Sequence, residues 1–153
     1  MDEWAMDAAG APSVVPRIRH WIQEALVGFS DDVRARMEVI ASEYATNCVR
    51  HSTAADGGTM HLRLIADSGK IRLEVRDNGP RQTAPDVWSP EEAADFGRGL
   101  FIVEQLADDM GDEVSPEGRL AWAEVKITCA RVHDLPACSD DQADRTADRR
   151  RGA

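Results

Sequence analysis

The chain has 153 residues, a length that favours one domain with its own hydrophobic core. Its net charge of −10 argues against direct binding to nucleic acid or to an anionic membrane, which would need a basic surface. The longest stretch without charged residues, 8–16, is far shorter than the ~20 apolar residues of a membrane-spanning helix. We therefore expect neither nucleic acid nor a membrane among the direct partners.

The cysteines indicate the redox environment. Cys48, Cys129 and Cys138 form no CxxC pair and are odd in number, so neither a disulfide scaffold nor a zinc site is expected. Free thiols in a reducing cytoplasm are the simpler interpretation.

Both ends of the chain lack a hydrophobic period. Residues 1–12 mix acids with Ala, Gly and Pro, and residues 134–153 are polar after Leu135. We predict a flexible N-terminal tail over 1–12, a folded domain over 13–133 and a disordered C-terminal tail over 134–153.

Two amphipathic helices are predicted at the start of the domain. Apolar residues recur at spacings of three and four between Val14 and Leu26, and again between Val33 and Cys48. Ser30, followed by two aspartates, is typical of a helix cap with an acidic first turn. The second helix should end near His51.

The rest of the domain predicts strands and one more helix. Alternating apolar residues indicate a hairpin over 60–64 and 71–75, and a last pair of strands over 112–115 and 120–128. Apolar spacing predicts a third helix over 98–108. Helices and antiparallel strands in separate blocks predict an α+β fold, a two-layer sandwich of a mostly antiparallel sheet with helices on one face.

A long segment, 80–96, precedes the third helix. It contains three prolines and little regular pattern. Ordinary loops are shorter, so this length indicates function or mobility.

Glu43 and Asn47 lie four residues apart on the second predicted helix and therefore share one of its faces. A carboxylate beside a carboxamide can hold a hydrated Mg²⁺ or position a hydroxyl. A solvated polar face is the alternative interpretation.

Asp77 continues the inward alternation of the strand over 71–75. A buried acid needs a polar partner, and the amine of a ligand would supply one. The alternative is a strand that ends at a turn, with Asp77 capping Gly79.

Gly97, Arg98, Gly99 and Leu100 precede the apolar pattern of the third helix. Two glycines before a helix allow backbone amides to face an anion. A glycine-rich loop without a ligand is the alternative.

The order of these three motifs resembles the ATP-binding domain shared by DNA gyrase, sensor histidine kinases, mismatch-repair MutL and a heat-shock chaperone, which has the Bergerat fold. The resemblance covers about residues 13–128. The segments SEYATNCVRHS, VRDNGP, GRGLFIVEQLAD and GRLAWAEV are most similar to stand-alone bacterial anti-sigma-factor serine kinases and their short actinobacterial relatives.

The resemblance implies ATP and Mg²⁺ as cofactors and a role for each motif residue. Asn47 would ligate the Mg²⁺, Glu43 would act as the catalytic base, and Asp77 would accept a hydrogen bond from the adenine amine. Gly79 would let the backbone approach the base, and the segment 80–96 would be the ATP lid. The triphosphate would lie along Gly97, Arg98, Gly99 and Leu100.

The resemblance also implies a function. It is that of a cytoplasmic serine/threonine kinase that phosphorylates an antagonist (anti-anti-sigma) protein and sequesters a sigma factor or a similar regulator. Related kinases are often dimers, so a homodimer is one option.

The sequence departs from the family pattern at two positions. Arg81 replaces the second glycine of the Asp77 motif, and Leu120 is placed where many relatives carry a threonine near the last strand. These changes leave a second hypothesis open, a nucleotide-binding regulator that binds partners without transferring phosphate. A detached histidine-kinase catalytic domain would need a dimerising, histidine-bearing helical hairpin, which residues 1–50 do not supply.

Overall fold

A computed structural model describes residues 1–51, 58–78 and 90–128 of the chain. The strands in these residues are β1 (Asp2–Ala9), β2 (Thr59–Asp67), β3 (Lys70–Asp77), β4 (Asp109–Ser115) and β5 (Gly118–Lys126). The helices are α1 (Val14–Ala25), α2 (Asp31–His51) and α3 (Pro90–Leu106).

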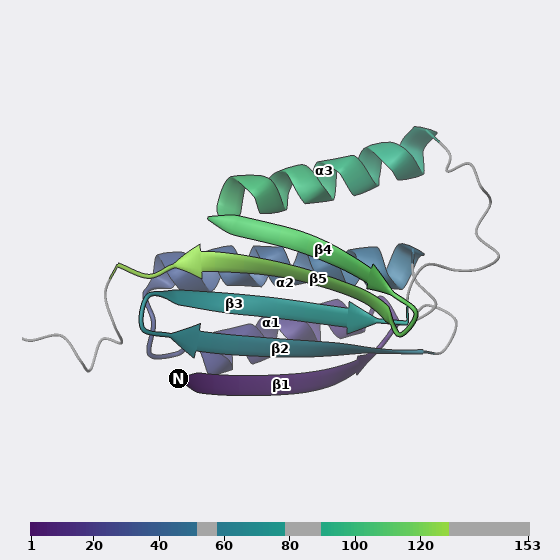
Figure 1. Ribbon diagram of the computed structural model, residues 1–153. Helices are drawn as coiled ribbons and strands as arrows, with labels where there is room; N and C mark the ends of the chain where they lie inside the picture. The colour runs from purple at the N-terminus through teal and green to yellow at the C-terminus, as the bar shows by residue number, and fades with distance from the viewer. Residues whose placement is uncertain (52–57, 79–89, 129–153) are drawn as a thin grey trace, which may run out of the picture.

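The strands form one open antiparallel sheet in the order β1-β2-β3-β5-β4. Helices α1 and α2 cover one face of this sheet, and α3 lies against α2 beyond the β4 edge (Figure 1). The predicted α+β two-layer fold is therefore confirmed. The four strands predicted from alternation are present, with ends that differ from the prediction by up to three residues.

The first two helices follow the sequence pattern closely. The Val33 amide donates to the Ser30 hydroxyl at 3.3 Å, and two aspartates occupy the first turn of α2, as the cap signal predicts. The faces of α1 and α2 that pack on the sheet supply fully buried side chains, among them Ile18, Ile22, Met37 and Ile40. Against them the sheet buries one alternating face, which includes Met60, Leu62, Leu64, Ile71, Leu73 and Val75.

The prediction of a flexible tail over residues 1–12 is wrong, because residues 2–9 form β1 at the edge of the sheet. Ala8 is buried, and Trp4 and Met6 are partly buried against the core. These three side chains alternate with the exposed residues Glu3, Ala5 and Asp7, so the segment has the period of a half-buried strand. The predicted C-terminal tail, 134–153, lies outside the described residues.

The third helix begins eight residues earlier than its predicted start at Arg98. Proline is tolerated at the first helical position because its missing amide hydrogen has no partner there, and Glu91 follows in the first turn, where the helix dipole favours acids. Of the segment assigned to the lid, residues 90–96 are therefore helical, and residues 80–89 lie outside the described residues.

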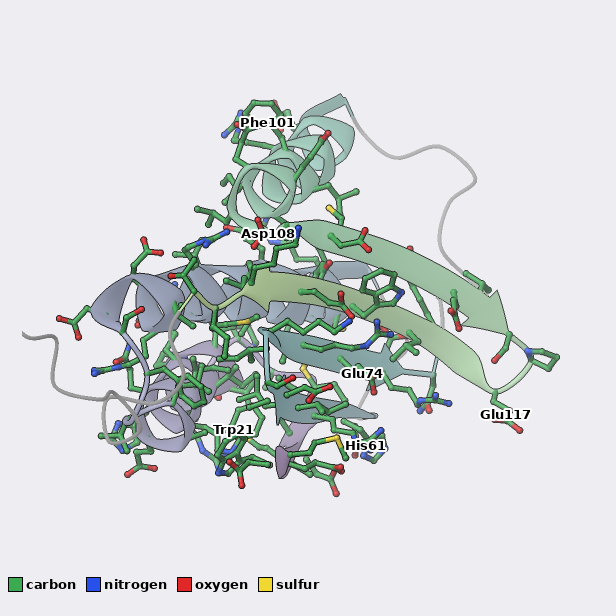
Figure 2. All side chains as sticks on the ribbon, turned by 60° about the vertical axis from the view of Figure 1, so that its left-hand side comes forward. Trp21, His61, Glu74, Phe101, Asp108 and Glu117 are labelled. Atoms are coloured by element: carbon green, nitrogen blue, oxygen red, sulfur yellow. The ribbon has the colours of Figure 1, made fainter. Side chains whose placement is uncertain are left out.

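The face of the sheet that points away from α1 and α2 is polar. Figure 2 shows His61 and Glu74 on this side. Ion pairs cross the strands here, joining His61 to Asp7, Arg63 to Glu3 and Glu74, and Arg72 to Glu74 and Glu124. Within the part of the chain that the structure describes, no helix has the length and apolar character needed to cross a membrane.

Candidate functional site

A cavity is lined by residues of helices α2 and α3, by the last residue of β3 and by the first halves of β4 and β5. It encloses about 160 Å³, less than the ~300–1,000 Å³ typical of a pocket for a whole drug-sized ligand. This volume suits one ring system rather than a complete nucleotide. The lining residues are Tyr44, Asn47, Cys48, Asp77, Leu100, Met110, Gly111, Asp112, Arg119 and Ala121.

Asp77 is the buried carboxylate of this cavity. Its side chain keeps the inward phase of β3, as predicted, and the residue is only 5% exposed. The Cys48 thiol donates a hydrogen bond to Asp77 Oδ2 at 3.1 Å. Burial raises the pKa of the Cys48 thiol, and the negative charge of Asp77 raises it further. Cys48 therefore stays a protonated donor.

Tyr44 forms a fixed wall of the same cavity. Its hydroxyl donates to the Trp122 carbonyl of β5 at 2.9 Å. Burial raises the pKa of Tyr44, and the charge of Asp112 adds to this rise. The phenol is thus a neutral aromatic surface that ties α2 to the sheet.

Glu43 and Asn47 are brought against α3 at Gly99. A Cβ atom at Gly99 would lie 2.7 Å from Glu43 Oε2 and 3.8 Å from Asn47 Oδ1, so only glycine leaves room for the present position of the Glu43 carboxylate. Arg36 of α2 holds the C-terminal end of α3 in place, because its Nε donates to the Leu106 carbonyl at 2.8 Å. The structure therefore places the two predicted polar residues side by side under one turn of α3.

The two polar residues line different cavities. Asn47 faces the cavity of Asp77, and Glu43 faces a second cavity of about 240 Å³. The second cavity is also lined by Thr46 and Arg50 of α2 and by Arg98, Gly99 and Ile102 of α3. Gly99 of α3 thus lines the cavity of Glu43, and the next residue, Leu100, lines the cavity of Asp77.

The prediction that the helix starts at this glycine motif, with backbone amides facing an anion, is wrong, because Gly97, Arg98 and Gly99 all lie inside α3, which begins at Pro90. Inside a helix, backbone amides are committed to the helix's own hydrogen bonds. In this conformation these residues contribute side-chain positions and close packing, and they do not form an anion-binding loop. Of the other predicted site residues, Leu100 lines the Asp77 cavity and Gly79 lies outside the described residues.

The donor set indicates how Mg²⁺ would be held. Among residues 1–51, 58–78 and 90–128, no three His, Cys, Asp or Glu side chains group as metal ligands. Mg²⁺ commonly uses one or two side chains together with phosphate oxygens and water. The amide oxygen of Asn47 fits that mode, with the remaining ligands supplied by a nucleotide.

Leu120 lies on the face of β5 that points away from the Asp77 cavity. In the β3–β5 register Leu120 pairs with Arg76, on the sheet face opposite to Asp77. Arg119 pairs with Asp77 itself and lines the cavity. Within β5 the side chain beside Asp77 at the cavity is thus that of Arg119, because neighbouring residues of a strand point to opposite faces.

Comparison with known proteins is consistent with this arrangement. Residues 8–125 match the family described as the histidine kinase-like ATPase domain. The chain belongs to that family. As a histidine kinase-like ATPase domain it has the ATP-binding fold that the three motifs predict.

Two relatives of this ATPase domain have names that state an activity. Two proteins of Bacillus licheniformis named serine-protein kinase RsbW are each 28% identical, over 96 and 95 residues. These matches cover 55% of this chain and 60% and 59% of the relatives, so the chain spans less than two thirds of each relative. The ATPase domain is thus similar in sequence to proteins named as serine-protein kinases.

A solved structure supports the fold of this ATPase domain. The RsbU and RsbW domains of Rv1364c from Mycobacterium tuberculosis superpose with a TM-score of 0.62 at 20% identity. The match covers 86% of this chain and 34% of that chain.

Four residues that line the cavity were not predicted from the sequence: Tyr44, Cys48, Asp112 and Arg119. Tyr44 and Cys48 belong to the apolar stripe of α2, which was interpreted as core. Cys48 directly follows Asn47, so proximity to a predicted ligand residue was the available signal. The placement of Asp112 and Arg119 depends on strand register, which the sequence alone does not give.

Proposed function

We propose that this ATPase domain binds Mg²⁺–ATP with the adenine ring in the Asp77 cavity. The observation that carries the proposal is the buried Asp77 carboxylate in a cavity that suits a single ring system. A buried acceptor is stabilised by a ligand donor, and the adenine amine is such a donor. Asn47, on the wall of the same cavity, would hold the Mg²⁺.

We propose further that the bound ATP phosphorylates a serine or threonine of a protein. The hydroxyl oxygen of the acceptor forms a bond to the γ-phosphorus, the bond to the β–γ bridging oxygen breaks, and ADP leaves. Glu43, in the second cavity, takes the hydroxyl proton as general base. Mg²⁺ supplies charge neutralisation at the phosphoryl group.

The proposed acceptor is an antagonist (anti-anti-sigma) protein, and the proposed regulator held by the kinase is a sigma factor. The names of the RsbW relatives support the serine-kinase part of this proposal. A cytoplasmic location and a homodimer are part of the same proposal.

A second candidate function is a nucleotide-binding regulator that binds partners without transferring phosphate. The continuity of α3 through Gly97 and Gly99 favours it, because these residues do not form a phosphate loop here.

A phosphorylation assay separates the two candidates. The chain is incubated with γ-labelled ATP, Mg²⁺ and antagonist-like proteins encoded beside it, and label on the acceptor is measured for the parent and Glu43→Ala. Label that depends on Glu43 supports the kinase. ATP binding without label on any of these proteins would favour the regulator.

A further inference from the structure

Strand β1 is an open edge of the sheet without the features that usually protect such an edge. Its eight residues pair with β2 in one uninterrupted register and include no proline, lysine or bulge. Within the part of the chain that the structure describes, β2 is its only neighbouring strand. A long edge strand of this kind is a template for a further strand, because the backbone N–H and C=O groups on its open side lack strand partners.

The acidic side chains on the outer face of β1 are paired with cations of the same sheet. Glu3 forms an ion pair with Arg63 of β2, and Asp7 forms one with His61. These pairs offset the negative charge that would otherwise repel a second acidic strand at the open edge.

A groove of about 520 Å³ lies beside this edge and is lined by residues of β1 and α1. Its apolar surface includes Met6 of β1 and Trp21 of α1, which Figure 2 labels. Arg17, His20 and Glu24 line it too, and their spacing places them with Trp21 on one stripe of α1. The His20 ring contacts the Glu24 carboxylate at 3.1 Å. The stripe therefore carries a cation at one end and a carboxylate at the other.

The order of charges along this stripe is complementary to itself under a two-fold rotation. Arg17 and Glu24 are equally far from the midpoint between His20 and Trp21. When two copies of the stripe lie antiparallel about that midpoint, each Arg17 meets Glu24 of the other copy. A two-fold axis normal to the sheet at this place also sets the two β1 edges antiparallel, like all neighbouring strands listed for this sheet. The charge order therefore favours a second copy of the chain as the occupant of the groove.

We propose that the chain forms a homodimer in which the two β1 strands pair antiparallel and the two α1 helices face each other across the groove. Arg17 of each copy lies beside Glu24 of the other. This inference rests on the homodimer of the proposed function and supplies its interface. The two five-stranded sheets become one continuous sheet, so both β1 edges are covered.

Charge exchange tests this interface. Sedimentation velocity at low ionic strength, where ion pairs are least screened, should show the parent as a dimer. Arg17→Glu and Glu24→Arg should each raise the dissociation constant about 10-fold or more, because each places like charges together twice in the dimer. The double variant, Arg17→Glu with Glu24→Arg, should dimerise nearly as tightly as the parent, since exchanging both charges recreates the two ion pairs.

Lys126→Glu is the matched control. It makes the same change of charge on an exposed side chain of β5, which β2 and β3 separate from β1, and it should dimerise as the parent does. Hydrogen exchange checks the pairing of the strands. Amides of residues 2–9 should exchange faster in Arg17→Glu than in the parent, because the open edge is again exposed to water. Arg17 and Glu24 are exposed, so the variants should fold, and circular dichroism verifies this.

Four results would each overturn this interface. They are a parent that sediments as a monomer at every concentration, a dimer that neither charge reversal weakens, a double variant as weak as the single ones, and equal exchange of residues 2–9 in the parent and Arg17→Glu. ATP binding is measured separately on the same samples. A monomeric parent that binds ATP would overturn the interface alone, whereas a dimer that responds as predicted but binds no ATP would overturn the proposed nucleotide site alone.

Discussion

Glu43 and Asn47 lie one turn apart on α2, yet they should act on different molecules. Asn47 lines the cavity of Asp77, where the nucleotide is proposed to bind, and Glu43 lines the neighbouring cavity. Gly99 of α3 lies above both side chains. The separation predicts that nucleotide affinity and phosphate transfer respond differently to changes at the two residues.

Asn47→Ala should weaken Mg²⁺-dependent ATP binding and abolish transfer, because it removes the proposed metal ligand. Glu43→Ala should leave ATP affinity within a small factor while phosphorylation of the acceptor falls about 10²–10⁴-fold, the usual contribution of a positioned base. ATP titration and single-turnover phosphorylation of each variant measure the two effects. Transfer by Glu43→Ala at the parent rate would show that Glu43 is not the base.

At the scale of elements, the packing of α3 on α2 sets the position of the Glu43 carboxylate. Gly97 and Gly99 lie in the same helix, but they differ in surroundings. A Cβ atom at Gly97 would meet nothing within 4 Å, whereas at Gly99 it would meet Glu43 Oε2. Alanine substitutions at these two positions therefore distinguish the cost of glycine in a helix from the need for space beside Glu43.

Gly97→Ala should raise the midpoint of thermal unfolding without nucleotide by about 2–4 °C, since alanine favours the helix by roughly 0.8–1 kcal/mol over glycine. Gly99→Ala should raise it less, because the Glu43 side chain must move. Its phosphate transfer should fall by about 10–100-fold, as expected for a displaced catalytic group. Equal thermal gains for the two variants, with transfer by Gly99→Ala unchanged, would contradict the proposed packing role of Gly99.

The elements that the sequence predicts well are those with strong local signals. The Ser30 cap and the apolar stripes of α1 and α2 required no knowledge of tertiary structure. The start of α3 also had a local signal, proline followed by two glutamates, but the three prolines of the segment favoured a loop. β1 was missed because its alanines and acids resemble a tail until the partner strand is known.

The residues of the candidate site also fall into two groups, those that a local sequence signal predicts and those that it does not. Asp77, Glu43 and Asn47 could be predicted, since each follows from the period of its own strand or helix. Arg119 could not, because its position opposite Asp77 depends on the register between β3 and β5.

At the scale of the whole molecule, β1 completes the sheet and covers part of the core. Ala8 is 4% exposed, whereas Ala5 is exposed on the same strand. Substitutions at these two alanines therefore distinguish an N-terminal strand from a flexible tail.

Ala8→Asp should lower the free energy of unfolding by about 3 kcal/mol, because it buries an unpaired carboxylate. Ala5→Asp should change it by less than about 0.5 kcal/mol. Urea denaturation measures both. If both variants are as stable as the parent, residues 2–9 do not pack as a strand in solution.

The most direct test of the central claim is calorimetric titration of the parent and Asp77→Asn with Mg²⁺–ATP and Mg²⁺–GTP. We predict that the parent binds ATP more tightly than GTP by roughly 5- to 150-fold, because guanine would leave buried acceptors facing each other at a cost of about 1–3 kcal/mol. Asp77→Asn should fold, bind ATP more weakly and lose most of this discrimination. Asp67→Asn, at the exposed end of β2, should match the parent. Equal affinities of the parent for ATP and GTP, or unchanged ATP binding by Asp77→Asn, would contradict the account.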